Sequence, residues 1–112
     1  MTESPPSGPV LVTVEYRPKP GREREVIDKL YAGRYARRRT GAVSWRLWVD
    51  AADPGRILEQ FAVGSWDDHL RQHERVSRRD ERRLTEIDAL TDPSQPPTVI
   101  HWLASQPDDT TR

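Results

Sequence analysis

The order of its apolar segments is the feature that most narrowly limits what this chain can fold into. Alternating apolar residues, which are typical of strands, occupy four segments, at residues 10–17, 43–50, 56–63 and 98–104. Helical spacing of apolar residues predicts a first helix at residues 22–39 and a second helical region at residues 65–90 with a kink near Val76. The order strand, helix, strand, strand, helix, strand predicts an α+β, ferredoxin-like fold, in which helices cover one face of a four-stranded antiparallel sheet.

Proline and glycine mark the ends of these elements. Pro18 helps to stop the first strand, and the turn AADPG at residues 51–55 joins the second and third strands into a hairpin. The two ends of the chain hold small, polar and proline residues, which do not form a packed element. We therefore expect three parts, a disordered tail, one folded domain and a polar tail, at residues 1–8, 9–105 and 106–112.

A sheet with helices on one face leaves its other face bare. Tryptophan and valine side chains from several strands are expected on that face, where they cannot be left in water. The chain is also short, at 112 residues, and only 34% of them are hydrophobic, which is lean for a monomer with its own closed cavity. We predict that two copies pack sheet to sheet as a homodimer, a dimeric α+β barrel.

Composition and charge narrow the classes of partner. Lysine plus arginine number 18 and aspartate plus glutamate number 18, so the formal net charge is zero and a basic nucleic-acid-binding face is not favoured. The absence of cysteine removes disulfides, thiolate nucleophiles and cysteine-ligated metals. No apolar run approaches the ~20 residues of a membrane span, and the first residues do not resemble a signal peptide. We expect a cytoplasmic protein with no membrane insertion and no nucleic-acid partner.

Two of the three histidines lie four residues apart in the segment SWDDHLRQHERV, at residues 65–76. In a helix, the spacing i, i+3, i+4, i+7 places on one stripe Trp66, His69, Leu70 and His73. Polar side chains occupy the opposite face, namely Asp67, Asp68, Arg71, Gln72 and Arg75. We therefore predict that both imidazoles point inward, and that Ser65 caps the start of the helix.

The order of elements, the hairpin WRLWVDAADPGRILEQF, the segment SWDDHLRQHERV and a last strand with a histidine together resemble the antibiotic biosynthesis monooxygenase-like domains of the dimeric α+β barrel superfamily. The chain is most similar to the C-terminal domain of transmembrane secretion effector exporters, of the major-facilitator type. The resemblance implies a pocket between sheet and helices. In enzymes of the superfamily such a pocket oxidises or cyclises polyphenolic or polyketide-like molecules without metal or flavin, whereas other relatives degrade haem or only bind a ligand. The positions that match are Trp66, His69, His73 and His101.

The resemblance and the inward histidines favour a cofactor-independent monooxygenase or cyclase of secondary metabolism, acting on a polyketide-like or polycyclic aromatic molecule. Such a reaction needs a base with a pKa near neutrality, a group that stabilises the substrate anion, and a dry pocket. Histidine, with an unperturbed pKa of about 6.5, suits the base. We expect His73 or His69 as the catalytic base, with Arg46 or Arg71 as the anion partner. The expected substrate-binding residues of a tryptophan-lined pocket are Trp66, His101, Arg46 and Trp48.

Other interpretations of the same residues stay open. An inward histidine is more often a core or interface residue than a catalyst, so the chain can instead be a non-catalytic ligand-binding or accessory module, or a dimerisation domain with a filled core. The spacing of His69 and His73 also suits a shared metal ion, with His101 as a third ligand, but the glutamate of the HExxH motif is missing. We expect no metal and no cofactor. The arginines at residues 37–39 form an anion-binding patch or, as we expect, a solvated helix end.

Overall fold

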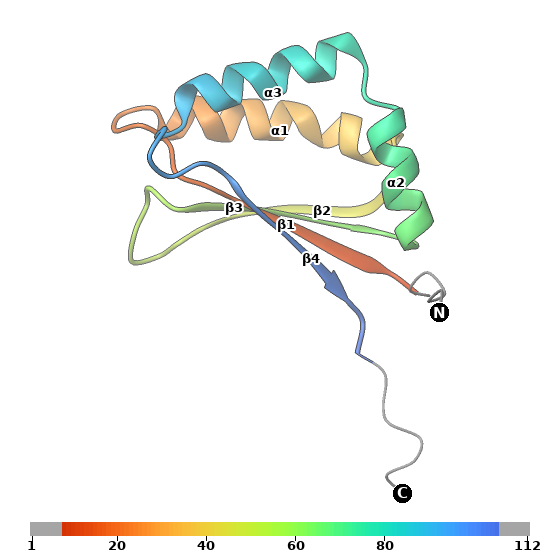
Figure 1. Ribbon diagram of the computed structural model, residues 1–112. Helices are drawn as coiled ribbons and strands as arrows, with labels where there is room; N and C mark the ends of the chain where they lie inside the picture. Colours follow the sequence, from red (N-terminus) through yellow and green to blue (C-terminus); the bar gives the residue numbers. More distant parts are fainter. Residues whose placement is uncertain (1–7, 106–112) are drawn as a thin grey trace, which may run out of the picture.

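Three helices lie on one face of a four-stranded antiparallel sheet (Figure 1). The computed structural model describes residues 8–105. The elements in chain order are β1 (Val10–Tyr16), α1 (Glu23–Arg39), β2 (Ala42–Val49), β3 (Ile57–Val63), α2 (Trp66–Glu74), α3 (Arg78–Leu90) and β4 (Thr98–Leu103). The strands lie in the order β2-β3-β1-β4. The predicted ferredoxin-like fold is therefore confirmed, whereas both predicted tails, apart from Gly8, lie outside the described residues.

The period of two along each strand separates the two faces of the sheet. Every second side chain of β1 is buried beneath the helices, namely Val10, Val12, Val14 and Tyr16. The pairing of β1 with β3 puts Val12 opposite Phe61, and its pairing with β4 puts Val12 opposite His101. Because directly opposed residues point to the same face, this register places His101 on the helix-covered side of the edge strand β4.

A β-bulge between Ala42 and Ser44 changes the predicted faces of β2. Alternation along residues 43–50 predicts Val43 and Trp45 on one face, but the structure buries Trp45 on the helix side and leaves Val43 74% exposed. A bulge opposes two residues of one strand to one residue of its partner, and it therefore disturbs the alternation of side chains at that point. The prediction for Val43 is wrong for this reason.

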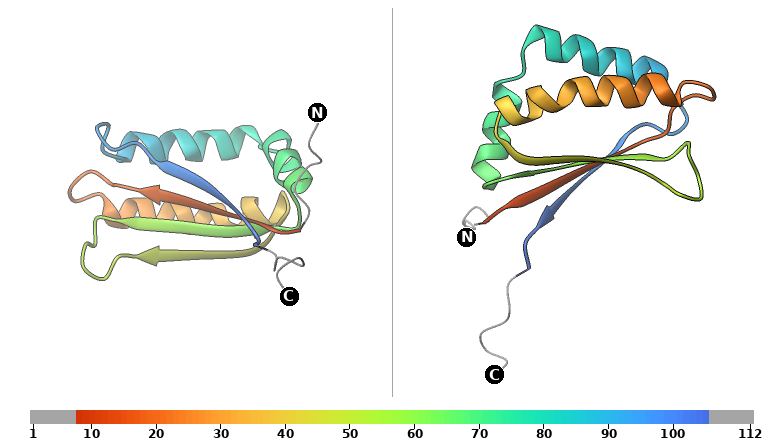
Figure 2. Two further views of the ribbon diagram at one scale, coloured as in Figure 1. Left: turned by 60° about the horizontal axis from the view of Figure 1, so that its bottom comes forward. Right: turned by 180° about the vertical axis from the view of Figure 1, so that it is seen from behind.

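The helical region after β3 divides where the sequence predicts a kink. Helix α2 ends at Glu74, and a capping box begins α3: the Asp80 N–H donates to Ser77 Oγ (3.2 Å) and the Ser77 N–H donates to Asp80 Oδ2 (3.1 Å). Helices α1 and α3 lie side by side along the sheet, and α2 lies across one end of it (Figure 2). On α3, Ile87 is buried, but Leu84, which helical spacing puts on the same stripe, is 43% exposed because α3 packs mainly against α1.

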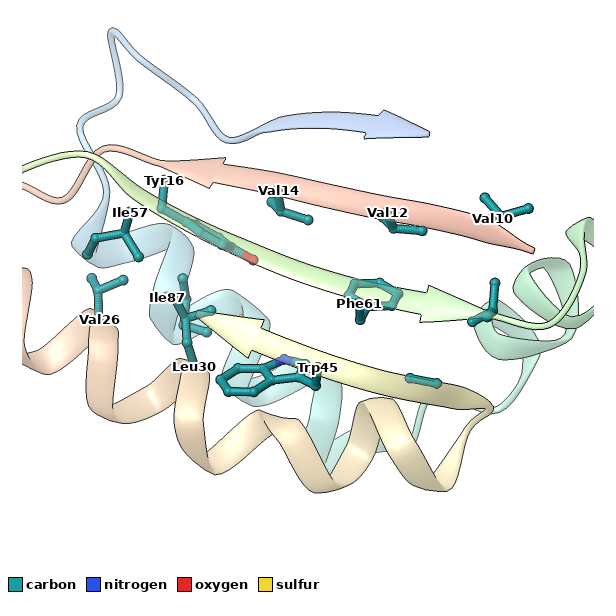
Figure 3. Close-up of a cluster of buried hydrophobic side chains, with 12 residues drawn as sticks. Val10, Val12, Val14, Tyr16, Val26, Leu30, Trp45, Ile57, Phe61 and Ile87 are labelled. Atoms are coloured by element: carbon teal, nitrogen blue, oxygen red, sulfur yellow. The ribbon is translucent and has the colours of Figure 1, made fainter. Parts of the chain in front are cut away.

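The hydrophobic core fills the layer between the sheet and α1 (Figure 3). Strand β1 supplies a row of valines, β3 supplies Ile57 and Phe61, and β2 supplies Trp45. From the helices, Val26, Leu30 and Ile87 pack down onto these side chains. Burial of a large aliphatic or aromatic side chain is worth about 1.5–3 kcal/mol, so this layer supplies most of the driving force that holds α1 to the sheet.

The face of the sheet that the described helices leave uncovered carries large apolar side chains among polar ones. Trp48, Ile100 and Trp102, which alternate with the helix-facing positions of their strands, are 48%, 42% and 50% exposed. We call these three residues the outer sheet patch. The indole N–H of Trp48 donates to Gln60 Oε1 (3.0 Å), and that of Trp102 donates to Thr13 Oγ1 (2.9 Å). Since their polar atoms are already paired within the sheet, the two rings offer apolar surface to a partner.

Candidate functional site

A cavity of about 70 Å³ lies between the helix layer and the sheet. Helices α1 and α3 supply apolar wall residues such as Leu30 and Ile87, and α2 supplies His69, Gln72 and His73. His73 and Leu84, both exposed, belong to the lining, so the cavity opens to solvent. The cavity is therefore small, with apolar residues of α1 and α3 on one side and the imidazoles of His69 and His73 on the other.

Helix α2 positions two of the imidazoles. Its start is capped as predicted, because the Asp68 N–H donates to Ser65 Oγ (3.1 Å). Its inward face buries His69, which is 5% exposed, while His73 lies one turn further along at the mouth of the cavity. The Nε2 atoms of His73 and His69 are 3.3 Å apart.

The third imidazole reaches the same point from the sheet. His101 of β4 brings its Nε2 to 3.0 Å from the Nε2 of His69. The Trp66 ring packs against both, with ring centroids 5.8 Å from His69 and 5.4 Å from His101. The structure thus joins α2 to the edge strand through three histidines, with His69 in contact with the other two. We call His69, His73 and His101 the histidine cluster.

The surroundings of His69 favour its neutral form. Burial lowers the pKa of His69 below its usual value, and the neighbouring His73, His101 and Arg37 lower it further, although a hydrogen bond with Gln72 works in the opposite direction. A neutral imidazole can accept a proton at physiological pH. This is the protonation state that a general base requires.

A buried carboxylate, Glu59 of β3, lies beside the cavity and joins four elements. The side chain is 2% exposed, yet its Oε1 accepts from the hydroxyl of Tyr16 (3.0 Å) and its Oε2 accepts from the indole N–H of Trp45 (2.8 Å). Arg37 of α1 donates to both oxygens, each at 3.1 Å, and its guanidinium carbon lies 4.5 Å from the centre of the Phe61 ring. Such a set of donors is what a buried charge needs to be tolerated.

Burial and the contact with Glu59 shift the pKa values of Tyr16 and Arg37. Burial raises the pKa of Tyr16 far above its usual value, and the adjacent Glu59 charge raises it further. Burial works against the charge of Arg37, but Glu59 outweighs it and the pKa of Arg37 is raised. Tyr16 therefore stays a neutral donor and Arg37 stays a cation. The expectation of a solvated helix end at residues 37–39 is wrong for Arg37, which binds the buried Glu59, whereas Arg38 and Arg39 are exposed and Arg39 pairs with Asp80 (2.7 Å).

The structure brings together four of the residues predicted for the site, namely Trp66, His69, His73 and His101. It does not bring Arg46 and Trp48 to them, because both lie on the uncovered face of the sheet, where Arg46 packs over the Trp48 ring. The expected tryptophan-lined pocket is not what the structure has: the residues that line the cavity include none of the four tryptophans.

Helix α2 is also turned relative to the predicted stripe. Leu70, predicted inward, is 47% exposed, and Gln72, predicted outward, is 4% exposed. Arg71, offered as an anion partner, pairs instead with Asp68 (2.6 Å) at the surface. The amide of Gln72 forms hydrogen bonds inside the molecule, with His69 on its own helix and with the carbonyl of Arg37 on α1, so its polar atoms are paired although the side chain is buried.

Sequence reasoning missed Glu59, Arg37 and Gln72 as residues of this site. Glu59 carried a signal, since the alternation of β3 gives it the same parity as the buried Ile57, Phe61 and Val63. A charged residue at a core position of a strand predicts a buried ion pair, and the basic end of the preceding helix offers the partner. For Gln72 the sequence held no comparable signal.

Neither a metal-binding cluster nor a membrane-spanning helix occurs among the described residues. Within residues 8–105, no group of three or more histidine, aspartate or glutamate side chains is arranged to hold a metal ion. No helix in that range has both the length and the apolarity to cross a bilayer.

Solved structures show which fold this arrangement of helices and sheet belongs to. Solved structures with the same fold include an antibiotic biosynthesis monooxygenase-type protein from Bordetella bronchiseptica, at 18% identity and TM-score 0.73, covering 89% of this chain and 100% of that one. A counterpart from Nitrosomonas europaea has 12% identity and TM-score 0.74, covering 96% and 98%. SnoaB, a cofactor-independent oxygenase from Streptomyces nogalater, has 14% identity and TM-score 0.73, covering 90% and 97%. The protein therefore has the antibiotic biosynthesis monooxygenase-like fold.

A comparison with protein-family models identifies the family within this fold. The model of the transmembrane secretion effector family matches residues 2–108, and the chain belongs to that family. No curated protein matches the sequence. The resemblance stated from the sequence is thus confirmed for fold and family.

The buried Glu59 network predicts a large effect of one neutral substitution. Glu59→Gln keeps the shape of the side chain but leaves the Arg37 guanidinium beside the core without a counter-charge. We expect the free energy of unfolding, measured by urea denaturation, to fall by about 3 kcal/mol. The matched control is Glu86→Gln, which breaks an exposed ion pair with Lys29 and should cost less than about 1 kcal/mol. Equal small losses in both variants would contradict the structural role assigned to Glu59.

Proposed function

We propose that the protein is a small-molecule enzyme of secondary metabolism, a cofactor-independent monooxygenase or cyclase for polyketide-like or polycyclic aromatic substrates. The observation that carries this proposal is the pair formed by a buried, neutral His69 and the adjacent His73 in the wall of a cavity between helices and sheet. The fold shared with a cofactor-independent oxygenase is consistent with it.

The reaction requires side chains that act as a base and that stabilise the substrate anion. An imidazole removes a proton from an acidic phenol or enol, and the resulting electron-rich anion reduces molecular oxygen. In an oxygenation of this kind one oxygen atom enters the product and the other leaves as water. The lining holds the cations Lys29, Arg37 and Arg83, each paired with a carboxylate, so a substrate anion has to compete for them with Glu86, Glu59 and Asp80. They are the anion partners that we propose in place of Arg46 and Arg71.

The size of the cavity sets a condition on this proposal. Small-molecule sites usually measure roughly 300–1,000 Å³, so about 70 Å³ is too little for a polycyclic substrate. The cavity has to widen when the substrate enters. Helix α3, which packs mainly against α1 and carries the exposed Leu84 and the half-buried Arg83, is the wall that can move.

A second candidate function is a non-catalytic ligand-binding or accessory module. Two observations favour it: the small cavity, which suits a narrow selection of ligands, and membership of a family described as transmembrane secretion effectors. Binding without turnover would show as quenching of tryptophan fluorescence, with no product formed in air.

We further propose that the protein is a homodimer formed through the outer sheet patch. The patch lies on the face opposite the cavity, so a second copy can cover it without closing the mouth at His73. A partner of identical surface satisfies the two-fold symmetry of most homodimers.

The assignment of the base is tested by substitution. With polycyclic phenols as substrates, His73→Ala and His69→Ala should lower kcat/KM about 10²–10⁴-fold, as loss of a general base does. Oxygen uptake and product absorbance measure the rate, and Leu70→Ala on the exposed side of α2 is the control. If His69 is the base, kcat/KM falls as the pH falls through a pKa below 6.5, because the protonated ring cannot accept a proton. Full activity in both variants would disprove the base assignment.

Sedimentation analysis tests the dimer. The wild-type chain should sediment as a dimer, and Ile100→Arg should give a folded monomer because it places a charge in the outer sheet patch. Tyr35→Arg, at a position that is 65% exposed on α1, is the control and should remain dimeric. A monomeric wild type at micromolar concentration would count against the proposed interface.

A further inference from the structure

One buried side chain beside the histidine cluster has no role in the reaction as proposed so far. Gln72 of α2 is 4% exposed and its amide is held at both ends. Its Nε2 lies 3.2 Å from the backbone carbonyl oxygen of Arg37, and its Oε1 lies 3.3 Å from Nδ1 of His69. The Arg37 carbonyl belongs to the last turn of α1, so the amide connects that helix end to the imidazole.

The hydrogen-bonding partners decide which way the amide faces. A carbonyl oxygen only accepts, so the amide NH₂ group must face the Arg37 carbonyl. The amide oxygen then faces His69, and it also only accepts. Nδ1 of His69 must therefore carry the hydrogen, and in the neutral ring Nε2 is left with the lone pair.

That lone pair lies where the other two histidines converge. Nε2 of His101 is 3.0 Å away and Nε2 of His73 is 3.3 Å away. The single lone pair of His69 Nε2 accepts one hydrogen at a time, and either neighbour donates to it only when its own Nε2 carries a hydrogen. For His73 this leaves Nδ1 as the basic nitrogen, and His73 lies at the mouth of the cavity.

We propose that Gln72 is a positioning residue, which holds His69 as the Nδ1–H tautomer so that its Nε2 supports His73 as the proton acceptor. This deepens the proposed function and rests on it for the catalytic part. In the proposed step Nδ1 of His73 takes the substrate proton, while the Nε2–H of His73 donates to Nε2 of His69. The imidazolium at His73 is thereby stabilised by a neutral ring of the correct tautomer. The groups that face His69 are His73 on its own helix, His101 on β4 and Arg37 on α1.

The tautomer is measurable without any substrate. Long-range ¹H–¹⁵N spectra of the imidazole rings in the full-length wild-type protein at pH 7.5 should show His69 protonated at Nδ1 and unprotonated at Nε2. Gln72→Leu should abolish this preference and give a mixture that includes the Nε2–H form. Gln72→Glu should restore the Nδ1–H form and raise the pKa of His69 by about one unit, because a carboxylate accepts the same hydrogen bond and favours the cation. Gln60→Leu, on the uncovered sheet face, is the matched control.

Kinetic measurements on the Gln72 variants distinguish a failure of this inference from a failure of the proposed function. With a phenolic substrate that is turned over, Gln72→Leu should lower kcat about 10–100-fold, and Gln72→Glu should recover part of the loss and shift the pH profile. A wild-type His69 protonated at Nε2, or a tautomer that is the same in Gln72→Leu, would overturn the inference even if the protein is an active oxygenase. If the tautomers behave as stated and no phenol is oxidised, the positioning by Gln72 stands and the proposed function fails.

Discussion

The buried carboxylate of Glu59 is the interaction on which the rest of the structure depends. It accepts hydrogen bonds from Tyr16 on β1, Trp45 on β2 and Arg37 on α1, so it ties three strands to the first helix at one point. A charge in that position would cost several kcal/mol without its partners. The main chain of Arg37 in turn receives the amide of Gln72, and through it the network reaches the histidine cluster. The geometry of the site therefore follows from the position of one charged group in the core.

The two faces of the sheet carry different groups of residues. On the helix side, the register between β1 and β4 brings His101 to His69, and the histidine cluster joins α2 to an edge strand that is otherwise exposed. On the other side, the outer sheet patch offers apolar surface with its polar atoms already paired. Arg46 and Trp48, which suit substrate binding by residue type, therefore belong to the uncovered side of the sheet and not to the cavity.

The sequence allowed the fold, the family and the proximity of four of the six predicted site residues to be inferred. Alternation and helical spacing gave the element order, and the i, i+4 relation of His69 and His73 gave their contact, because both depend on the local geometry of the chain. Features that depend on long-range contacts were not accessible. The bulge that exposes Val43 depends on the pairing of β2 with β3, and the rotation of α2 that buries Gln72 in place of Leu70 depends on the partners that α1 presents. The convergence of His101 on His69 required the sheet register, which periodicity alone does not supply.

The central claim is that the cavity beside His69 and His73 admits an aromatic ligand. A crystal structure of the protein soaked with a hydroxynaphthalene tests it most directly. The account predicts density for the ring between Leu30, Ile87 and α2, with the ligand hydroxyl within hydrogen-bonding distance of His73 and with α3 displaced outward. Density confined to the outer sheet patch, with the cavity unchanged, would contradict it.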